Sequence, residues 1–262
     1  MSSGEGLVGE AVAQAHAHVM QSLLAFPLDA SDLLLGCAGE PTFTIRAARS
    51  WGERNAASLL ISRLYGRRGY KANTLPAEHD ENSVTLVASV QDAVVGTLTI
   101  GFDSGSLLLA DELFPDEVNA LRSSGRQLCE FTKLAIDGLA RSQRVLAAMF
   151  HVAFIQAHRI RGCDNLLIEV NPRHRRFYET KLGFEVIGPV RTNQRVNAPA
   201  LLLSLDLWQA QARVAEYGGR PAASAIERSL YPFAFSTQEE SGIVARLRAQ
   251  SAPDRTPTAC PA

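Results

Sequence analysis

Hydrophobic and polar positions follow two spacings along the 262 residues, one typical of strands and one typical of helices. Runs of branched and aromatic residues predict strands at 43–49, 83–90, 94–102, 128–136, 166–170, 185–187 and 201–207. Apolar residues three to four positions apart, or local capping signals, predict helices at 7–26, 50–65, 115–125, 141–158, 173–181 and 239–248.

Three of these helices carry recognisable end signals. Ser50 followed by Glu53 is a capping box, so we expect a helix to begin at this point. Pro115 suits a first helical turn. Gly183 suits the left-handed residue that ends a helix.

The order of elements predicts the fold class, which is α/β with a mixed sheet. After an N-terminal helix the chain reads β-α-β-β-(α)-β-α-β-α-β-β, and the alternation in its second half implies parallel pairs with covering helices. We predict an N-terminal helical extension, a central domain, a C-terminal helical extension and a disordered tail, over residues 1–40, 41–210, 211–250 and 251–262.

Composition narrows the class of protein. With 46% apolar residues, 20% charged residues and a net charge of −1, the chain is neither fibrous nor wholly disordered, and coating nucleic acid is not its task. The four cysteines lack metal-ligand spacing, no run approaches the ~20 apolar residues of a membrane helix, and the first basic residue is Arg46. We expect a cytoplasmic protein with reduced thiols, no metal and no integral membrane segment, while peripheral membrane contact stays open.

The net charge conceals three blocks of charge. Residues 41–75 hold seven Lys or Arg and one acid, residues 76–120 hold nine acids and no Lys or Arg, and residues 121–195 hold thirteen basic and six acidic residues. Such blocks are most simply solvated faces of helices and loops. The alternative is a basic surface that binds an acidic partner and lies opposite an acidic surface.

Residues 170–184 contain the first candidate for chemistry. The letters VNP, FY and LGF, at 170–172, 177–178 and 182–184, describe a buried strand, a helix and a second strand. This pattern resembles the C-terminal half of the GNAT acyltransferase superfamily, whose matching tyrosine protonates the departing thiolate. Tyr178 is therefore either a general acid or an aromatic anchor between helix and sheet.

The strand at 128–136 contains the second candidate, a glutamate and a lysine among apolar residues. Charged groups in such a strand are costly to bury unless they are paired or hydrated. Alternation places Glu130 and Lys133 on opposite faces unless a bulge re-aims one of them. Glu130 could take a proton from an attacking amine and Lys133 could bind a carboxylate or a thioester oxygen, or the pair could be structural, with Lys133 bridging to an acid.

Two longer segments extend the resemblance. ADELFPDEV leading into CEFTKLAID, within Ala110 to Asp137, and IEVNPRHRRFYETKLGFEVIG, from Ile168 to Gly188, resemble the long-chain N-acyl amino acid synthases (FeeM-like), which are related to the acyl-homoserine-lactone synthases. The resemblance covers about residues 43–207. It implies a GNAT-like fold and synthesis of N-acyl amino acids from acyl carrier protein thioesters, with the acyl-phosphopantetheine as donor and no tightly bound cofactor.

Departures from relatives refine the expected substrates. Lys133 replaces an arginine of the lactone synthases, and residues 97–102 lack another, which argues against S-adenosylmethionine and favours a free amino acid. Acyl-CoA enzymes have a glycine-rich loop for pyrophosphate before the long helix. Residues 138–144 hold one glycine and two arginines there, which favours a carrier protein.

The resemblance then implies a role for each candidate residue. Glu130, Lys133 and Tyr178 would be catalytic, and the backbone near Thr132 with Asn171 would bind the oxyanion or the donor. Basic residues near the expected donor entrance would attract an acidic carrier protein or would only decorate a solvated face, and these are Arg141, Arg144, Arg173, Arg175 and Arg176.

The predicted function is transfer of a long-chain acyl group from acyl carrier protein to the amine of an amino acid. An acyl-CoA-dependent GNAT N-acyltransferase is the nearer alternative. A non-catalytic lipid-binding or scaffold module of the same fold is the alternative from another class. A lactone-type signal synthase ranks below them because the arginines are missing.

Overall fold

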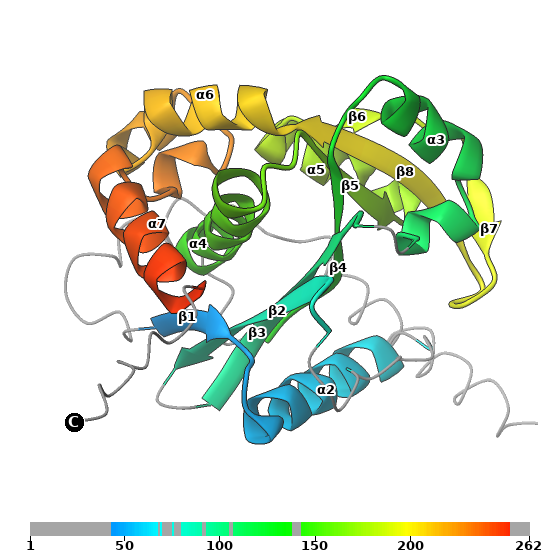
Figure 1. Cartoon of the computed structure of the whole chain (residues 1–262), viewed down its shortest axis with the longest axis horizontal. Helices are drawn as coiled ribbons and strands as arrows, with labels where there is room; N and C mark the ends of the chain where they lie inside the picture. Colours follow the sequence, from blue (N-terminus) through cyan, green and yellow to red (C-terminus); the bar gives the residue numbers. More distant parts are fainter. Residues whose placement is uncertain are drawn as a thin grey trace, which may run out of the picture.

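A mixed sheet of eight strands forms the centre of the computed structural model (Figure 1). The structure describes residues 43–67, 69, 75, 80–90, 93–104, 107–137 and 143–251, without the side chains of the last two. The predicted helix at 7–26 and the predicted tail beyond residue 251 lie outside the described residues.

The strands follow the order β1-β2-β3-β4-β5-β8-β6, and β7 pairs with β8. Their bounds are β1 Phe43–Ala47, β2 Ser83–Val90, β3 Ala93–Phe102, β4 Leu128–Ile136, β5 Asn165–Val170, β6 Glu185–Val186, β7 Arg191–Asn193 and β8 Ala198–Asp206. Only β4 and β5 are parallel, whereas the sequence predicted several parallel pairs. The difference arises because the chain returns from β5 to β8 in the opposite direction.

Six α-helices and five shorter helical turns surround the sheet within the described residues. The α-helices are α2 Trp51–Gly66, α3 Pro115–Ser123, α4 Gln143–Phe154, α5 Arg175–Leu182, α6 Leu207–Tyr217 and α7 Thr237–Ser251. The turns are η1 Leu109–Glu112, η3 Ile155–Ile160, η4 Pro172–His174, η5 Pro221–Ala225 and η6 Tyr231–Phe233. The predicted long helix is therefore α4 followed by the π-helical segment η3.

The predicted helix ends are confirmed. The Ser50 hydroxyl accepts the Glu53 N–H at 3.2 Å while the Glu53 carboxylate accepts the Ser50 N–H at 3.0 Å, which completes the capping box before α2. Gly183 ends α5 with φ of 81°, a conformation that favours glycine.

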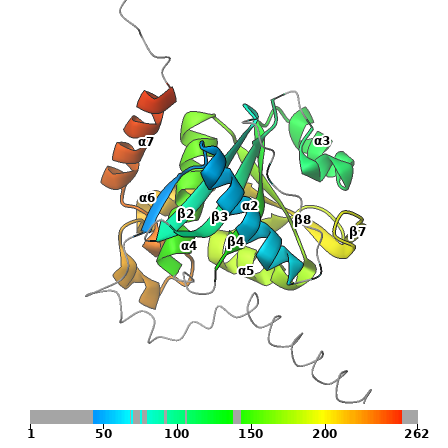
Figure 2. The same ribbon diagram turned by 90° about the horizontal axis from the view of Figure 1, so that it is seen from below.

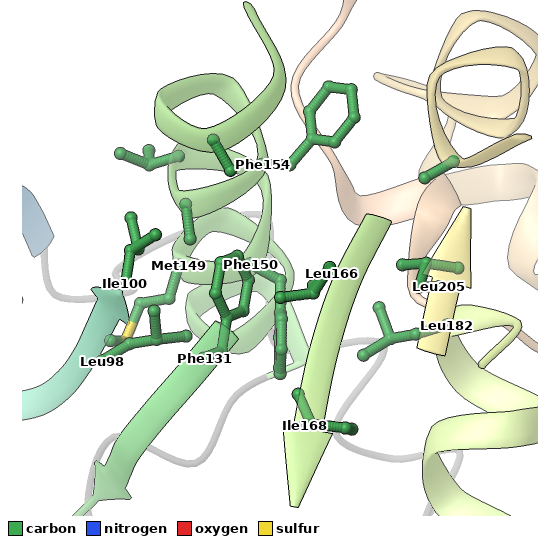
Figure 3. Close-up of a cluster of buried hydrophobic side chains, with 14 of the residues drawn as sticks. Leu98, Ile100, Phe131, Met149, Phe150, Phe154, Leu166, Ile168, Leu182 and Leu205 are labelled. Atoms are coloured by element: carbon green, nitrogen blue, oxygen red, sulfur yellow. The ribbon is translucent and has the colours of Figure 1, made fainter. Parts of the chain in front are cut away.

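The two faces of the sheet are covered by different helices (Figures 1 and 2). α4 packs on one face, where Met149 and Phe150 contact a large apolar cluster with Leu98 and Phe131 (Figure 3). α2 packs on the other face against Val87 and Ala135, and η1 with α3 covers that face further along, around Leu128 and Leu167.

The C-terminal segment adds to the α4 side. Asp206 ends β8 and starts α6, since its carboxylate accepts the N–H groups of Trp208 and Gln209 at 2.9 and 3.0 Å. The predicted strand at 201–207 therefore ends one residue earlier, and α6 is a helix that the sequence pattern did not predict. Leu207 and Val214 of α6 and Tyr231 of η6 join the large apolar cluster.

The charge blocks are paired with one another. Four acids of the 76–120 block form ion pairs with arginines of the 121–195 block: Asp103 and Asp111 with Arg122, Glu117 with Arg191, and Glu112 with Arg195. This part of the acidic block is therefore not a free acidic surface. Among the described residues no helix is long and apolar enough to cross a membrane, and no group of His, Cys, Asp and Glu is placed to hold a metal ion.

Candidate active site

The parallel pairing of β4 and β5 ends early. Three residues of each strand are in register, from Leu128 opposite Asn165 to Glu130 opposite Leu167. β4 then continues to Ile136, so its edge toward β5 has no strand partner beyond Glu130. We call this place the β4–β5 junction, and it leaves peptide groups in the middle of the sheet available for a ligand.

A β-bulge follows on β4. Thr97 and Thr99 of β3 lie opposite Ala135 and Thr132, so β4 holds one extra residue between these pairs. Lys133 lies in the bulge with φ of 52°, and its carbonyl oxygen accepts the Thr97 hydroxyl at 2.8 Å. The exception to strict alternation that the sequence left open, a bulge between Glu130 and the end of the strand, is therefore present at Lys133.

Glu130 is buried at the junction, with 6% of its surface exposed. Its two carboxylate oxygens accept the N–H groups of Leu109 and Ala110, at 2.8 and 3.1 Å, at the start of η1. Burial raises the pKa of Glu130, although these two hydrogen bonds and the charge of Arg195 oppose the shift. Glu130 therefore anchors η1 to the sheet, a role that the sequence did not reveal.

Lys133 is half-buried close to two other charges. Burial lowers its pKa, the nearby Glu130 carboxylate opposes this shift, and the cation of Arg54 adds to it. No ion pair within 4 Å joins Lys133 to a carboxylate of the described residues, so these residues do not form the structural ion pair that was the alternative to a functional role.

Arg54 is a residue of the site that the sequence reasoning missed. It lies on α2, is only 8% exposed and shares the buried face of that helix with Ala57 and Ile61. The signal was present, because Arg54 precedes these apolar residues by three and seven positions, the spacing of one helix face. An arginine on an apolar face indicates a buried partner for its charge.

A second carboxyl group lies near Glu130. Glu169 of β5 pairs with Arg195 at 3.1 Å, and Arg195 also binds Glu112 of η1 at 2.8 Å. Burial raises the pKa of Glu169, while hydrogen bonding by Asn193 and the Arg195 charge oppose the shift. The sequence reasoning also missed Glu169, because its partner Arg195 lies far from it along the chain.

η1 is held in place by Arg122 of α3. The guanidinium contacts both oxygens of Asp103, at 2.7 and 3.0 Å, and both oxygens of Asp111, at 2.6 and 2.7 Å. Asp111 also accepts the Leu108 N–H at 2.8 Å. Two bidentate pairs therefore fix the turn whose N–H groups bind Glu130.

Tyr178 lies on the α4 side of the sheet. It is half-buried on α5 and packs against the α4-side cluster, with its ring 5.7 Å from that of Phe184 and 5.2 Å from that of Phe177, both edge-on. Glu130, which binds η1, and Tyr178 therefore lie on opposite faces of the sheet.

The two expected oxyanion or donor residues have backbone roles. The Asn171 side-chain oxygen accepts the Arg173 N–H at 3.2 Å and caps η4. Asp103 donates its N–H to the Leu128 carbonyl, so the Leu128 peptide faces β3, and strand alternation turns the Thr132 peptide the same way.

The expected carrier-binding arginines cluster in part. Arg173, Arg175 and Arg176 are exposed around the start of α5, and Arg175 binds Glu179 at 2.6 Å. Arg144 is half-buried at the start of α4, and Arg141 lies outside the described residues.

The sheet order, with one parallel pair that separates in the middle of the sheet, defines a GNAT-like acyltransferase fold. The model of the FeeM N-acyl amino acid synthase family matches residues 56–206. The chain belongs to this family and is an acyltransferase, as the sequence resemblance predicted, and the alternative of a non-catalytic module is set aside.

The chain is also similar to solved structures. The structure of FeeM, an N-acyl amino acid synthase from uncultured soil microbes, is 26% identical, with a TM-score of 0.59 over 66% of this chain and 94% of that chain. The acyl-homoserine-lactone synthase LasI is 12% identical, with a TM-score of 0.47 over 64% of this chain and 91% of that chain. No curated protein sequence matches the chain significantly.

Proposed function

We propose that the protein transfers a long-chain acyl group from an acyl carrier protein thioester to the amine of a free amino acid. The observation that carries the acceptor is the grouping of Arg54, Lys133 and Glu130 at the junction. An amino acid has an amine and a carboxylate on one carbon, so its site needs a cation and a proton acceptor close together. The relative FeeM is an N-acyl amino acid synthase, which supports the same product class.

The reaction follows from these positions. Lys133 and Arg54 bind the acceptor carboxylate, and the acceptor ammonium passes one proton to Glu130, directly or through water. The amine nitrogen then attacks the thioester carbonyl at the junction, the C–N bond forms and the C–S bond breaks. Tyr178 gives its proton to the departing phosphopantetheine thiolate. The second proton, which the nitrogen releases as the amide forms, passes through water and restores the Tyr178 hydroxyl.

The oxyanion formed during this attack needs a hydrogen-bond donor. The Thr132 peptide faces β3, so we assign this role to the N–H of the adjacent Lys133, at the bulge. Thr97 supports the assignment, because its hydroxyl holds the Lys133 carbonyl and thereby orients this part of the backbone.

The carrier protein is proposed as donor partner on charge. Arg173 and Arg176 are exposed near Tyr178, where a carrier delivering its phosphopantetheine arm would dock an acidic surface. Arg144, at the start of α4, would extend this surface, and a role for Arg141 stays a prediction from the sequence. Cytoplasmic location accords with a soluble carrier as donor and stays part of the proposal.

Incubation with acyl carrier protein thioesters of several chain lengths and a pool of amino acids tests the proposal. Mass spectrometry is expected to find N-acyl amino acids, formed faster from the carrier thioester than from the same acyl group on CoA. A faster reaction with acyl-CoA would replace the carrier by CoA as donor. A folded protein that acylates no amino acid from either donor would overturn the proposed acceptor.

Tyr178→Phe tests the proton donor. We expect kcat to fall about 100-fold with little change in KM, because the ring still packs while the proton is lost. Tyr217→Phe, which removes a hydroxyl at the end of α6, is the control and should leave kcat unchanged. Equal kcat values in the two variants would make Tyr178 only an anchor.

A further inference from the structure

An apolar cavity lies on the α4 side of the sheet. It lies among α4, α6, η6 and the strands β4, β5 and β8, and it is partly open to solvent. Figure 3 shows Phe131 of β4, Phe150 of α4 and Leu166 of β5 together in this region. Apolar and aromatic side chains dominate its wall, as they do in small-molecule sites.

The polar side chains of the cavity wall, Tyr231 and His151, face other groups of the protein, and the Nε2 atom of His151 lies 3.5 Å from a carboxylate oxygen of Glu240. The Tyr231 hydroxyl donates to the Leu182 carbonyl at 2.7 Å, and the Nδ1 atom of His151 accepts the Phe235 N–H at 3.0 Å. Water in such a space would find few partners, whereas a hydrocarbon loses nothing by entering it. The cavity therefore suits an apolar ligand.

The cavity begins next to the proposed reaction centre. Phe131 directly follows Glu130, the last β4 residue in register with β5. Phe184 also lines the cavity, and its ring packs against Tyr178. A thioester held at the junction would thus have the cavity on the same side as the proposed proton donor.

Much of the wall comes from outside the family match, which ends at residue 206. The later residues supply six of the fifteen that line the cavity, and these are Leu207, Ala210, Val214, Leu230, Tyr231 and Ala234. This segment therefore closes a space that the matched part of the chain leaves open on one side.

We infer that this cavity holds the acyl chain of the donor and that the segment 207–234 limits the length of that chain. The inference rests on the proposed function for the identity of the ligand.

Ala210→Leu tests the length limit, because it adds three carbons to the wall. The longest acyl groups should be lost from the products, at about fourfold per excluded methylene, while shorter groups are still transferred. Ala215→Leu makes the same change on an exposed position of α6 and should leave the length distribution unchanged. Identical distributions in the two variants would overturn the inference.

A binding measurement separates this inference from the proposed function. A fluorescent polyunsaturated fatty acid, titrated into the full-length protein, should bind and be displaced by saturated fatty acids, and Ala210→Leu should weaken the binding at least tenfold relative to Ala215→Leu. Binding without any amino acid acylation would leave the cavity assignment intact and reject the proposed reaction. Amino acid acylation without fatty acid binding, and with no change of product chain length in Ala210→Leu, would leave the proposed reaction intact and reject the cavity assignment.

Val214→Ala provides a second variant if Ala210→Leu does not fold. It removes two carbons from the same wall, so the product distribution should shift to longer acyl groups by one or two methylenes. An unchanged distribution in this folded variant would also overturn the inference.

Discussion

Lys133 combines an unusual backbone conformation with an unusual charge environment. Its positive φ places it in the β4 bulge, and burial together with Arg54 makes its ammonium form less favourable than in water. The nearby Glu130 carboxylate opposes this effect. In the proposed reaction the acceptor carboxylate would place a further negative charge beside Lys133.

The affinity for the amino acid should depend on pH through Lys133. Its pKa lies below the ordinary value of 10.5, so the ammonium is lost as pH rises through that lower value, and the acceptor KM should rise over the same range. Lys133→Arg keeps a cation at these pH values and should flatten the profile. Steady-state kinetics from pH 7 to pH 10.5 makes the comparison, and a profile unaffected by Lys133→Arg would contradict it.

Thr97 is expected to position the bulge. Thr97→Val removes the hydroxyl that holds the Lys133 carbonyl without changing the size of a fully buried side chain, so kcat should fall about tenfold or more. Thr85→Val is the matched control, since it breaks the buried Thr85–Thr99 hydroxyl bond on the neighbouring strand. Each variant should lose about 1 kcal/mol of unfolding free energy, and only the first should lose kcat.

The sequence identified individual site residues only where a local pattern exposed them. Glu130 and Lys133 stood out because they interrupt one apolar strand, and Tyr178 because it belongs to a family pattern. Arg54 and Glu169 take their meaning from contacts with distant parts of the chain. The two hydrogen bonds from η1 to Glu130 join residues about twenty positions apart, and no periodic pattern in the sequence indicates them.

η1 is a four-residue helical turn that depends on its neighbours for stability. Arg122 binds Asp103 and Asp111, Asp111 caps the turn, and Glu130 binds its first N–H groups. η1 and β4 thus stabilise each other. Loss of the Arg122 ion pairs should therefore also disturb the Glu130 carboxylate at the junction.

Arg122→Lys tests this link between η1 and the site. A lysine cannot reproduce the two bidentate pairs, so we expect a loss of about 3 kcal/mol of unfolding free energy, measured by urea denaturation. The kcat should fall as well, because Glu130 loses the fixed N–H groups that hold it. Arg213→Lys, which breaks the surface pair with Glu227, is the control and should cost less than 1 kcal/mol. Similar losses of unfolding free energy in the two variants would show that the Arg122 ion pairs stabilise the protein no more than a surface ion pair does.

Elements with strong periodicity were predicted closely and weak ones were not. β2 and β4 have the predicted bounds, because each is a run of branched or apolar residues with clear ends. β7 has three residues and carries no pattern of its own, since its position follows from pairing with β8. α6 was missed because its few buried residues are separated by polar ones.

The C-terminal segment is structurally continuous with the catalytic domain. Leu207, Val214, Leu230 and Tyr231 are buried in the same cluster as α4. A chain that ends after Asp206 would expose this apolar surface and is expected to be insoluble or to unfold without cooperativity. A chain that ends after Gln250 keeps every one of these residues and should melt like the full-length protein. Cooperative, equal melting of both truncated chains would contradict this expectation.

The short register between β4 and β5 has a consequence for how the molecule opens. Strands β1–β4 and β5–β8 each have extensive antiparallel ladders, but only three residue pairs join these two halves of the sheet. Local opening of the sheet should therefore occur mainly between β4 and β5. Amide hydrogens at this junction should exchange with deuterium sooner than those of β2 or β8. A bound acyl thioester would contact both halves of the sheet and slow this exchange. The rate of amide exchange at the β4–β5 junction should therefore report whether the donor is bound.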